Sequence, residues 1–363
     1  MAPTRSQLRI PDALANWPYK RQINPHFVEV KAESDEWVQN LHAFNEKSQW
    51  AFDRCDFALL AALVYPMLDK AGLRTAANLL VLLFVFDDYT DRVDGAGVQA
   101  YADIVLDALH NPHKPRPEGE SVIGEIARQF WATAITHSSQ NSQRHLIQTF
   151  TEYVNAVVKE ADDRVQDHVR HIDEYMELRR QTAGGYPCFF PVERHFELPD
   201  DVIFHPTIQR LCLLACNSIV LTNDVCSYNI EQSAGHEGHN ILTVVMRQKG
   251  LDMEASLDWV TQYHSDCLAE FLELRRNLPS FGPELDDTVA EYVDGVAQWV
   301  RGGDCWSFES RRYFGDRGLE VQKVRKVDLL PVLGMDDMTP MMAPMVIEAQ
   351  NELNALSMTV KVA

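Results

Sequence analysis

The sequence is short of the features that mark several classes of protein. Its seven cysteines are scattered, with no Cys-x-x-Cys pair and no zinc-type spacing, so neither a metal finger nor a disulfide framework is predicted. The 17 glycines form no glycine-rich phosphate loop and no repeat is visible, which excludes the common nucleotide-binding motifs and solenoid folds. Cysteines without a pairing pattern favour a reducing, cytoplasmic location.

Long apolar runs are also missing. The two longest lie at residues 79–86 and 211–221, the second interrupted by Asn217 and Ser218. Both are shorter than the roughly 18 residues that mark a membrane span. The first residues, Met1-Ala2-Pro3-Thr4-Arg5, lead into mixed polar sequence without the apolar segment of a secretory signal. We therefore expect no transmembrane segment, and we expect the two runs to form buried helices.

Positive charge is scarce, since 33 Lys and Arg stand against 53 Asp and Glu and give a net charge of −20. An acidic surface repels nucleic acid phosphates, so DNA or RNA binding is not expected. The same balance argues against a polybasic membrane anchor. A chain of 363 residues is long enough for one core that encloses a cavity.

Helical periodicity dominates the sequence and predicts an all-α fold. Clusters of proline and glycine separate the helices. We expect an irregular strap over residues 1–33, a single helical domain over 34–316, and a tail over 317–363 that is partly helical or disordered. The predicted helices cover residues 35–47, 52–65, 74–91, 96–109, 120–136, 141–166, 172–186, 208–231, 241–247, 253–277 and 285–301.

Three carboxylates follow the first apolar run. Asp87 and Asp88 come directly after it, and Asp91 lies one turn beyond Asp87 on the same helical face. Carboxylates at the end of a buried helix are costly without a positive partner, and at a C-terminus they oppose the helix dipole. Mg²⁺ takes such hard oxygen ligands, so the motif favours a metal site over a solvent-facing helix end. Phe84 is one turn earlier and would face the same space.

The second apolar run ends in a different set of oxygen ligands. Asn223, Ser227 and Glu231 are spaced by four residues and share one helical face. Alone, this stripe fits a polar helix face at least as well as a metal site. The presence of two buried helices that each lead into oxygen ligands favours a metal site over a polar helix face. Facing one another, the two sets could hold several magnesium ions and a diphosphate.

Together these motifs resemble the class I terpene synthases, and among them the fungal sesquiterpene cyclases. Residues 87–91 (DDYTD) match the family's DDxxD motif, and residues 223–231 (NDVCSYNIE) match its Asn-Asp-x-x-Ser-x-x-x-Glu triad. Residues 311–313 (RRY) resemble its Arg-Tyr pair, and residues 175–182 (YMELRRQT) resemble the helix that carries its diphosphate-sensing arginine. The resemblance runs from about Ser34 to Tyr313 and implies one α-helical bundle around a central apolar cavity.

The resemblance also implies roles for particular side chains. Arg179 is the expected diphosphate sensor, with Arg180 as the competing choice, and Arg312 and Tyr313 would bind the diphosphate as the site closes. Trp306 would line the cavity and stabilise carbocations, and Ala183 or Gly184, at the helix break before Pro187, would be an effector position. Phe84 is a further candidate from its position on the helix, although core packing is an equally good interpretation. Three Mg²⁺ ions per site are implied, with ligands drawn from Asp87, Asp88, Asp91, Asn223, Ser227 and Glu231.

Several features stay open at this point. The family often has a basic residue before the triad glutamate, but this chain has Ile230, so that cation is missing or comes from another residue such as Arg311. Phe189 or Phe190 could also line the cavity, although core packing is an equally good interpretation. His236 and His239 lie in a glycine-rich turn without a third ligand, which favours a structural role over metal binding.

The predicted function is that of a magnesium-dependent sesquiterpene synthase. It would ionise farnesyl diphosphate, cyclise the allylic cation to a hydrocarbon or alcohol and release diphosphate. The alternatives are a synthase of an acyclic terpene alcohol (linalool or nerolidol type), a chain-elongating prenyltransferase, and a non-catalytic helical scaffold that binds diphosphates. Prenyltransferases of that kind carry two aspartate-rich motifs, whereas this chain has one. The chain could act as a monomer or a homodimer.

Overall fold

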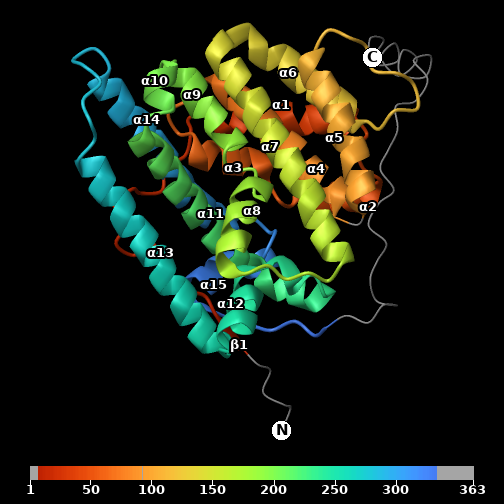
Figure 1. Ribbon diagram of the computed structural model, residues 1–363. Helices are drawn as coiled ribbons and strands as arrows, with labels where there is room; N and C mark the ends of the chain where they lie inside the picture. Colours follow the sequence, from red (N-terminus) through yellow and green to blue (C-terminus); the bar gives the residue numbers. More distant parts are fainter. Residues whose placement is uncertain (1–6, 92, 333–363) are drawn as a thin grey trace.

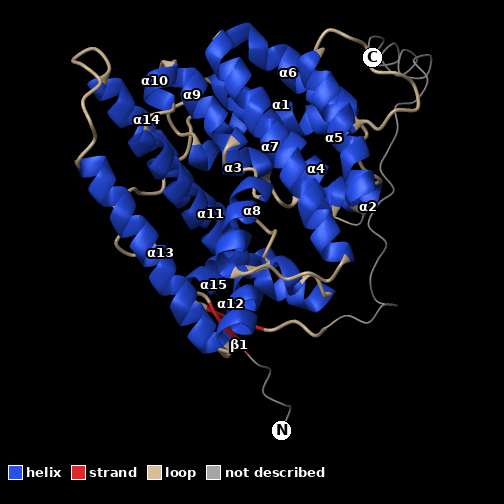
Figure 2. Ribbon diagram, viewed as in Figure 1, coloured by secondary structure: helices blue, strands red, loops and turns tan. Residues whose placement is uncertain are grey.

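The computed structural model describes residues 7–91 and 93–332, and most of this part is helical (Figures 1 and 2). The predicted all-α fold is confirmed. The predicted strap and tail fall partly outside the described residues, at 1–6 and 333–363. The helices are α1 (Phe27–Asn40), α2 (Glu46–Asp53), α3 (Phe57–Val64), α4 (Lys70–Thr90), α5 (Gly95–His110), α6 (Ile123–Ala134), α7 (Gln140–Val165), α8 (Ile172–Thr182), α9 (Phe190–Phe196), α10 (Asp200–Ile203), α11 (Pro206–Ala234), α12 (Ile241–Lys249), α13 (Met253–Arg276), α14 (Asp286–Glu309) and α15 (Gly318–Val324).

The two helices that carry the predicted ligands begin and end on local signals. At the start of α4 the Asp69 carboxylate accepts a hydrogen bond from the amide of Gly72 over 2.7 Å, which caps the helix. The first turn of α11 carries Pro206, whose missing amide proton costs nothing there. Its C-cap is Gly235 with φ of 74°, a left-handed conformation that glycine adopts freely. Both helices therefore place their polar ends where the sequence predicts.

α11 lies at the centre of the bundle and packs against α13 and α14, while α14 also packs against α3. Among the described helices, α11 alone is long and apolar enough to cross a membrane, but 78% of its apolar window is buried inside the protein. That burial is typical of a core helix.

The helix break after α8 brings the backbone close to α11. α8 ends at Thr182, short of the predicted 186, and Gly184 adopts φ of 64°. A Cβ atom on Gly185 would lie 2.8 Å from the sulfur of Cys216, so only glycine permits this approach. The carbonyl oxygen of Gly184 accepts a hydrogen bond from the amide of Cys188 over 3.3 Å.

A two-stranded antiparallel sheet ties the first described residues to the last. β1 (Gln7–Arg9) pairs with β2 (Lys326–Asp328), with Leu8 opposite Val327, and Arg9 of β1 forms ion pairs with Glu254 and Asp258 of α13. Beyond β2, Asn229 donates to the carbonyl of Asp328 over 3.0 Å and accepts from the amide of Leu330 over 2.8 Å. The end of the described chain is thus fastened to α11.

The predicted helix over 35–47 is wrong, because α1 spans Phe27–Asn40 and α2 begins at Glu46. His42 has φ of 48°, and the Asn45 side chain accepts from the amides of Lys47 and Ser48, which starts a new helix. The short helices α2, α9, α10 and α15 and both strands were not predicted. The division into strap, domain and tail stays a prediction, although α1 begins before its expected boundary at residue 34.

Candidate active site

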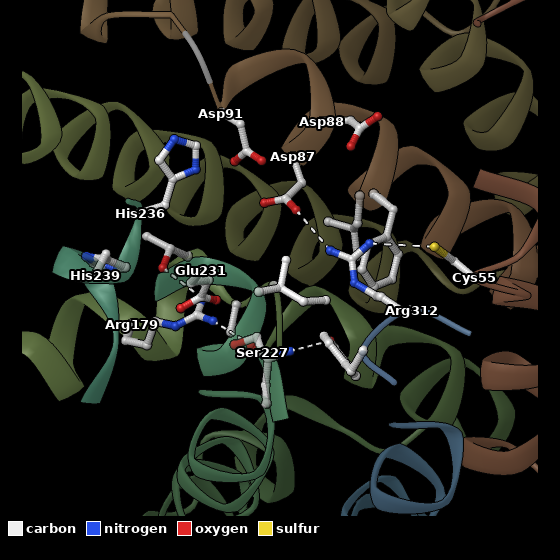
Figure 3. Close-up of a pocket in the computed structure, with 18 of the residues that line it drawn as sticks. Cys55, Asp87, Asp88, Asp91, Arg179, Ser227, Glu231, His236, His239 and Arg312 are labelled. Carbon is white, nitrogen blue, oxygen red and sulfur yellow. Dashed lines mark hydrogen bonds and ion pairs between the residues drawn. The ribbon is translucent and has the colours of Figure 1, made fainter. Parts of the chain in front are cut away.

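A cavity of about 910 Å³ opens among α4, α7, α8, α11 and α14. Its lining includes both charged and apolar side chains. Carboxylates and arginines from α4, α7, α8 and α11 gather in one part, shown in Figure 3. Another part is apolar and aromatic, with side chains that include Phe57, Leu83, Tyr153, Trp299 and Trp306. The cavity therefore pairs a charged region with a hydrocarbon-lined one.

The three carboxylates of α4 do not converge on one point. Asp87 and Asp91 point into the cavity, whereas Asp88 extends on the other side of Asp87 (Figure 3). Asp87 keeps 46% of its side chain exposed, yet the enclosing walls remove enough water to raise its pKa, an effect that nearby Arg312 opposes. Burial, with repulsion from Asp87 and Glu160, raises the pKa of Asp91 well above its usual value. The site thus holds more negative charge than its own cations balance.

The predicted triad on α11 faces the same cavity. Asn223, Ser227 and Glu231 all line it, as their spacing of four predicts. The Asn223 carbonyl oxygen accepts from Nη2 of Arg179 over 2.7 Å, and its amide donates to the hydroxyl of Tyr313 over 2.6 Å. Burial, with repulsion from Asp224, raises the pKa of Glu231 to about 7. All three oxygen ligands are therefore present at one wall.

Arg179 is the arginine of α8 that enters the cavity. Its Nε donates to Oδ1 of Asp224 over 3.1 Å, and Asp224 also accepts from the hydroxyl of Tyr175 and from the amide of Ile241 over 3.0 Å. Asp224 is fully buried. Arg180 instead donates to Asn217 over 3.1 Å and does not line the cavity. The structure thus presents Arg179 to the site, although the sensing role itself stays a prediction.

Asn240 supports the triad and was missed in the sequence. Its side-chain amide donates to Oε2 of Glu231 and to the carbonyl of Asp224, both over 2.8 Å. Its own oxygen accepts from the amide of Leu242 over 3.0 Å and caps α12. Asn240 is fully buried, so these contacts fix the Glu231 carboxylate from behind. Capping patterns would suggest the α12 contact, but the contact with Glu231 needs the fold.

Arg312 joins the aromatic wall to the carboxylates. Its guanidinium lies 5.0 Å from the ring centroid of Phe84 and 3.8 Å from Oδ2 of Asp87. Tyr313 packs edge-on against Trp306 with ring centroids 5.8 Å apart. The indole N–H of Trp306 donates to the carbonyl of Cys55 over 2.7 Å. The structure therefore brings together Phe84, Trp306, Arg312 and Tyr313 as the sequence predicts.

A second unpredicted feature is the pair of Glu160 and His239. Nε2 of His239 lies 3.1 Å from Oε2 of Glu160. Burial raises the pKa of Glu160, but the attraction and hydrogen bonding of His239, together with Arg179 and Thr182, lower it to about 2. His236 and His239 both line the cavity (Figure 3), so their turn lies at the site. The ion pair with Glu160 holds His239 at the cavity wall, and its structural role stays a prediction.

The structure also answers two questions left open by the sequence, the place of Phe189 and Phe190 and the missing cation at Ile230. Phe189 and Phe190 are buried in the core and do not line the cavity, because the turn after α8 presents Ala183, Gly184 and Cys188 instead. Ile230 lines the cavity with 38% of its surface exposed, so this position supplies no cation. Arg311 lines the mouth, but its Nε is paired with Asp316 over 2.6 Å.

The residues present fit a divalent cation with hard-ligand preference. Within residues 7–91 and 93–332, no three His, Cys, Asp or Glu side chains cluster closely enough to hold a metal by themselves. Mg²⁺ keeps several water or phosphate oxygens and needs only one or two carboxylates. Asp87 and Asp91 on one side, and Asn223, Ser227 and Glu231 on the other, supply such oxygens. The raised pKa values of Asp91 and Glu231 mark negative charge that a cation would balance.

Comparison with known proteins gives a consistent result. Residues 78–270 match the family described as "Terpene synthase family 2, C-terminal metal binding". Sesquiterpene synthase 14 of Postia placenta is 47% identical over 336 residues, covering 93% of this chain and 96% of that protein. A Delta(6)-protoilludene synthase of Stereum hirsutum is 47% identical over 341 residues, covering 93% and 92%.

Solved structures share the fold at lower sequence identity. Germacradien-4-ol synthase of Streptomyces citricolor superposes with a TM-score of 0.70 at 25% identity, covering 80% of this chain and 96% of that one. A linalool/nerolidol synthase of Streptomyces clavuligerus gives a TM-score of 0.70 at 20% identity, covering 80% and 98%. Because synthases with such different names share it, the fold does not determine the product.

Proposed function

The chain belongs to the terpene synthase family, and on this premise we propose that it is a magnesium-dependent sesquiterpene synthase that ionises farnesyl diphosphate and cyclises the resulting cation. One observation carries the proposal. The oxygen ligands of α4 and α11 and the arginines Arg179 and Arg312 line the same cavity as the aromatic side chains Phe84, Trp299 and Trp306. A diphosphate and its hydrocarbon chain need these two kinds of surface side by side.

The charged region would bind the diphosphate. Asp87 and Asp91, with Asp88 beside them, and the triad Asn223, Ser227 and Glu231 would hold three Mg²⁺ ions. Bound Mg²⁺ neutralises the charge of the departing diphosphate and so favours breakage of the carbon–oxygen bond. Arg179, Arg312 and Tyr313 would donate hydrogen bonds to the diphosphate oxygens, contacts that strengthen as charge develops on the leaving group.

Arg179 and Tyr313 are already joined through Asn223, over 2.7 and 2.6 Å. In this arrangement a metal ligand and two diphosphate donors share one hydrogen-bonded unit. Binding of metal and diphosphate would redirect the Arg179 guanidinium from the Asn223 oxygen to the diphosphate. The Tyr313 hydroxyl accepts from Asn223, so its own proton would be donated to the diphosphate. The unit would thereby couple metal binding to capture of the leaving group.

The apolar region would hold the farnesyl chain. Departure of diphosphate leaves an allylic cation, and no nucleophile of the protein is needed. The walls exclude water and fold the chain, while aromatic faces stabilise positive charge through their quadrupoles. Phe84 is stacked on Phe57 with centroids 3.9 Å apart and lies 5.9 Å from Trp306. This group would receive the first cation close to the diphosphate.

The choice of a C15 substrate is supported by Sesquiterpene synthase 14, which is 47% identical over 93% of this chain. Several relatives are named for Delta(6)-protoilludene, which makes that product the first to look for. The presence of both oxygen-ligand sets in one cavity, each at the end of an apolar helix, disfavours a non-catalytic scaffold that binds diphosphates.

The test is to incubate the purified chain with Mg²⁺ and geranyl, farnesyl or geranylgeranyl diphosphate, and to analyse volatile products and released diphosphate. We expect a cyclic C15 product from farnesyl diphosphate, abolished by a chelator. Release of an acyclic alcohol would support the linalool or nerolidol type of synthase instead. A longer prenyl diphosphate, formed when isopentenyl diphosphate is added, would identify a prenyltransferase. No product from any substrate would overturn the enzymatic proposal.

A further inference from the structure

Two adjacent glycines of α14 have opposite surroundings. A Cβ atom on Gly302 would lie 2.6 Å from the carbonyl oxygen of Leu63 and 2.7 Å from a methyl carbon of Val64. Gly302 therefore allows α14 and α3 to approach closely. A Cβ atom on Gly303 would have no atom within 4 Å among the described residues. Nothing in the packing requires glycine at this second position.

Backbone conformation gives no reason for glycine at residue 303 either. Gly303 lies in the interior of a 24-residue helix, and it is not among the residues with positive φ. Glycine weakens a helix interior relative to alanine, because its backbone loses more conformational freedom on folding. A position that carries this cost without a steric or conformational need is a candidate for a functional one.

Gly303 lines the cavity, in the middle of the wall that α14 provides. Trp299 lies four residues before it and Trp306 three residues after it, and both also line the cavity. This spacing puts the three residues near one helical face. Val300, Asp304 and Ser307 also line the cavity from this helix. Between the two indoles the wall has bare helix backbone at Gly303.

We propose that Gly303 is a specificity-determining residue, whose missing side chain leaves the space in which part of the isoprenoid chain folds against α14. The inference rests on the proposed cyclase function and adds the position that shapes its product. An alkyl group placed between the two indoles can approach the backbone of α14 at Gly303. A methyl group at residue 303 would occupy that space and change which carbons of the chain meet.

The consequence should be large for product choice and small for ionisation. One methyl group in an apolar pocket discriminates between bound species by about tenfold or more. The residues proposed to bind the metal ions and diphosphate lie on α4, α8 and α11. Arg312 and Tyr313 follow the end of α14. Substitution of Gly303 should therefore leave diphosphate release nearly intact while redistributing the products.

The test compares Gly303→Ala, Gly303→Leu and Gly302→Ala with the wild type. For each we would measure diphosphate release, the product profile from farnesyl diphosphate, the relative turnover of geranyl and farnesyl diphosphate, and the melting temperature. For Gly303→Ala we expect an unchanged or higher melting temperature, diphosphate release within about threefold, and at least about a tenfold change in the ratio of products. Gly303→Leu should shift preference toward the shorter geranyl substrate.

Gly302→Ala is the matched control, because it adds the same methyl group one residue away. It should lower the melting temperature through its clash with Leu63. If the wild type releases diphosphate but both Gly303 variants keep its product ratio within about twofold and its substrate preference, the role of Gly303 is overturned and the proposed function stands. Absence of any diphosphate release by the wild type would instead overturn the proposed function.

Discussion

The side-chain amide of Asn223 donates a 2.6 Å hydrogen bond to the hydroxyl of Tyr313, which lies 90 positions further along the chain. Burial raises the pKa of Tyr313 to about 12, so its hydroxyl keeps its proton at neutral pH. This contact links the triad on α11 to the segment that follows α14. It also places a hydroxyl donor next to the predicted metal ligand.

Tyr313→Phe should lower turnover while keeping the ring packed against Trp306. Losing a hydrogen bond to a charged group is expected to slow diphosphate release roughly tenfold to a hundredfold. Steady-state diphosphate release measures this. Tyr101→Phe is the control, because Tyr101 lies half-buried on α5 and outside the cavity lining. Equal rates for wild type and Tyr313→Phe would refute a role for the hydroxyl.

Asn240→Ala should weaken metal binding more than it slows the reaction. It removes the 2.8 Å hydrogen bond to Glu231, and loss of such a supporting contact typically costs tenfold to a hundredfold in metal affinity. We expect the Mg²⁺ concentration for half-maximal activity to rise by roughly that factor, with activity largely restored at high Mg²⁺.

The control for Asn240→Ala is Asn229→Ala. Asn229 is also a buried asparagine, and it lies on α11, the helix that carries the predicted triad. Its contacts hold Asp328 and Leu330 rather than the cavity. This variant should lower the melting temperature and leave the Mg²⁺ dependence unchanged. If Asn240→Ala lost activity that high Mg²⁺ did not restore, with an unaltered half-saturation point, the positioning role would be wrong.

His264 should make the fold sensitive to mild acid. It is 3% exposed, its Nε2 has no hydrogen-bond partner among the described residues, and burial lowers its pKa to about 4 from 6.5. Between these values the unfolded chain binds a proton that the folded protein does not. Stability from this group is therefore present above pH 6.5 and lost as the pH falls toward 4, by roughly 2 to 4 kcal/mol.

Urea unfolding of the wild type and His264→Leu at pH 7 and pH 5 tests this. The variant should lose less stability than the wild type between the two values. The comparison is needed because His264 and Asp304 both line a second, smaller cavity, and Asp304 acts in the opposite direction. Burial raises its pKa to about 6, so its contribution is lost as the pH rises through 6. Identical losses in both proteins would contradict the assignment to His264.

Much of the site could be predicted because its signals are local. Asp87 and Asn223 each follow an apolar run, and a spacing of four residues places side chains on one helical face. A spacing does not tell how two helices face one another. Arg179 and Arg180 are neighbours in sequence, and only the packing of α8 on α11 directs Arg179 into the cavity.

Other features need the folded chain. Asn240 caps α12, a role that a sequence pattern can suggest, but its contact with Glu231 forms only when α11 and α12 meet. Gly302 and Gly303 are adjacent glycines that no sequence pattern tells apart. Only the fold shows that Gly302 packs against α3 and Gly303 does not. The short helix α2 lacks a buried residue, so it leaves no apolar periodicity to detect.

The account depends most on the claim that α4 and α11 act as one metal and diphosphate site. Single-turnover diphosphate release from farnesyl diphosphate with saturating Mg²⁺ measures this directly for Asp87→Ala, Asn223→Ala and the control Asp103→Ala, which removes an exposed carboxylate of α5. We predict a fall of at least about a hundredfold for the first two, a rate equal to wild type for the control, and helical circular dichroism unchanged in all three. Wild-type rates in both Asp87→Ala and Asn223→Ala would contradict the account.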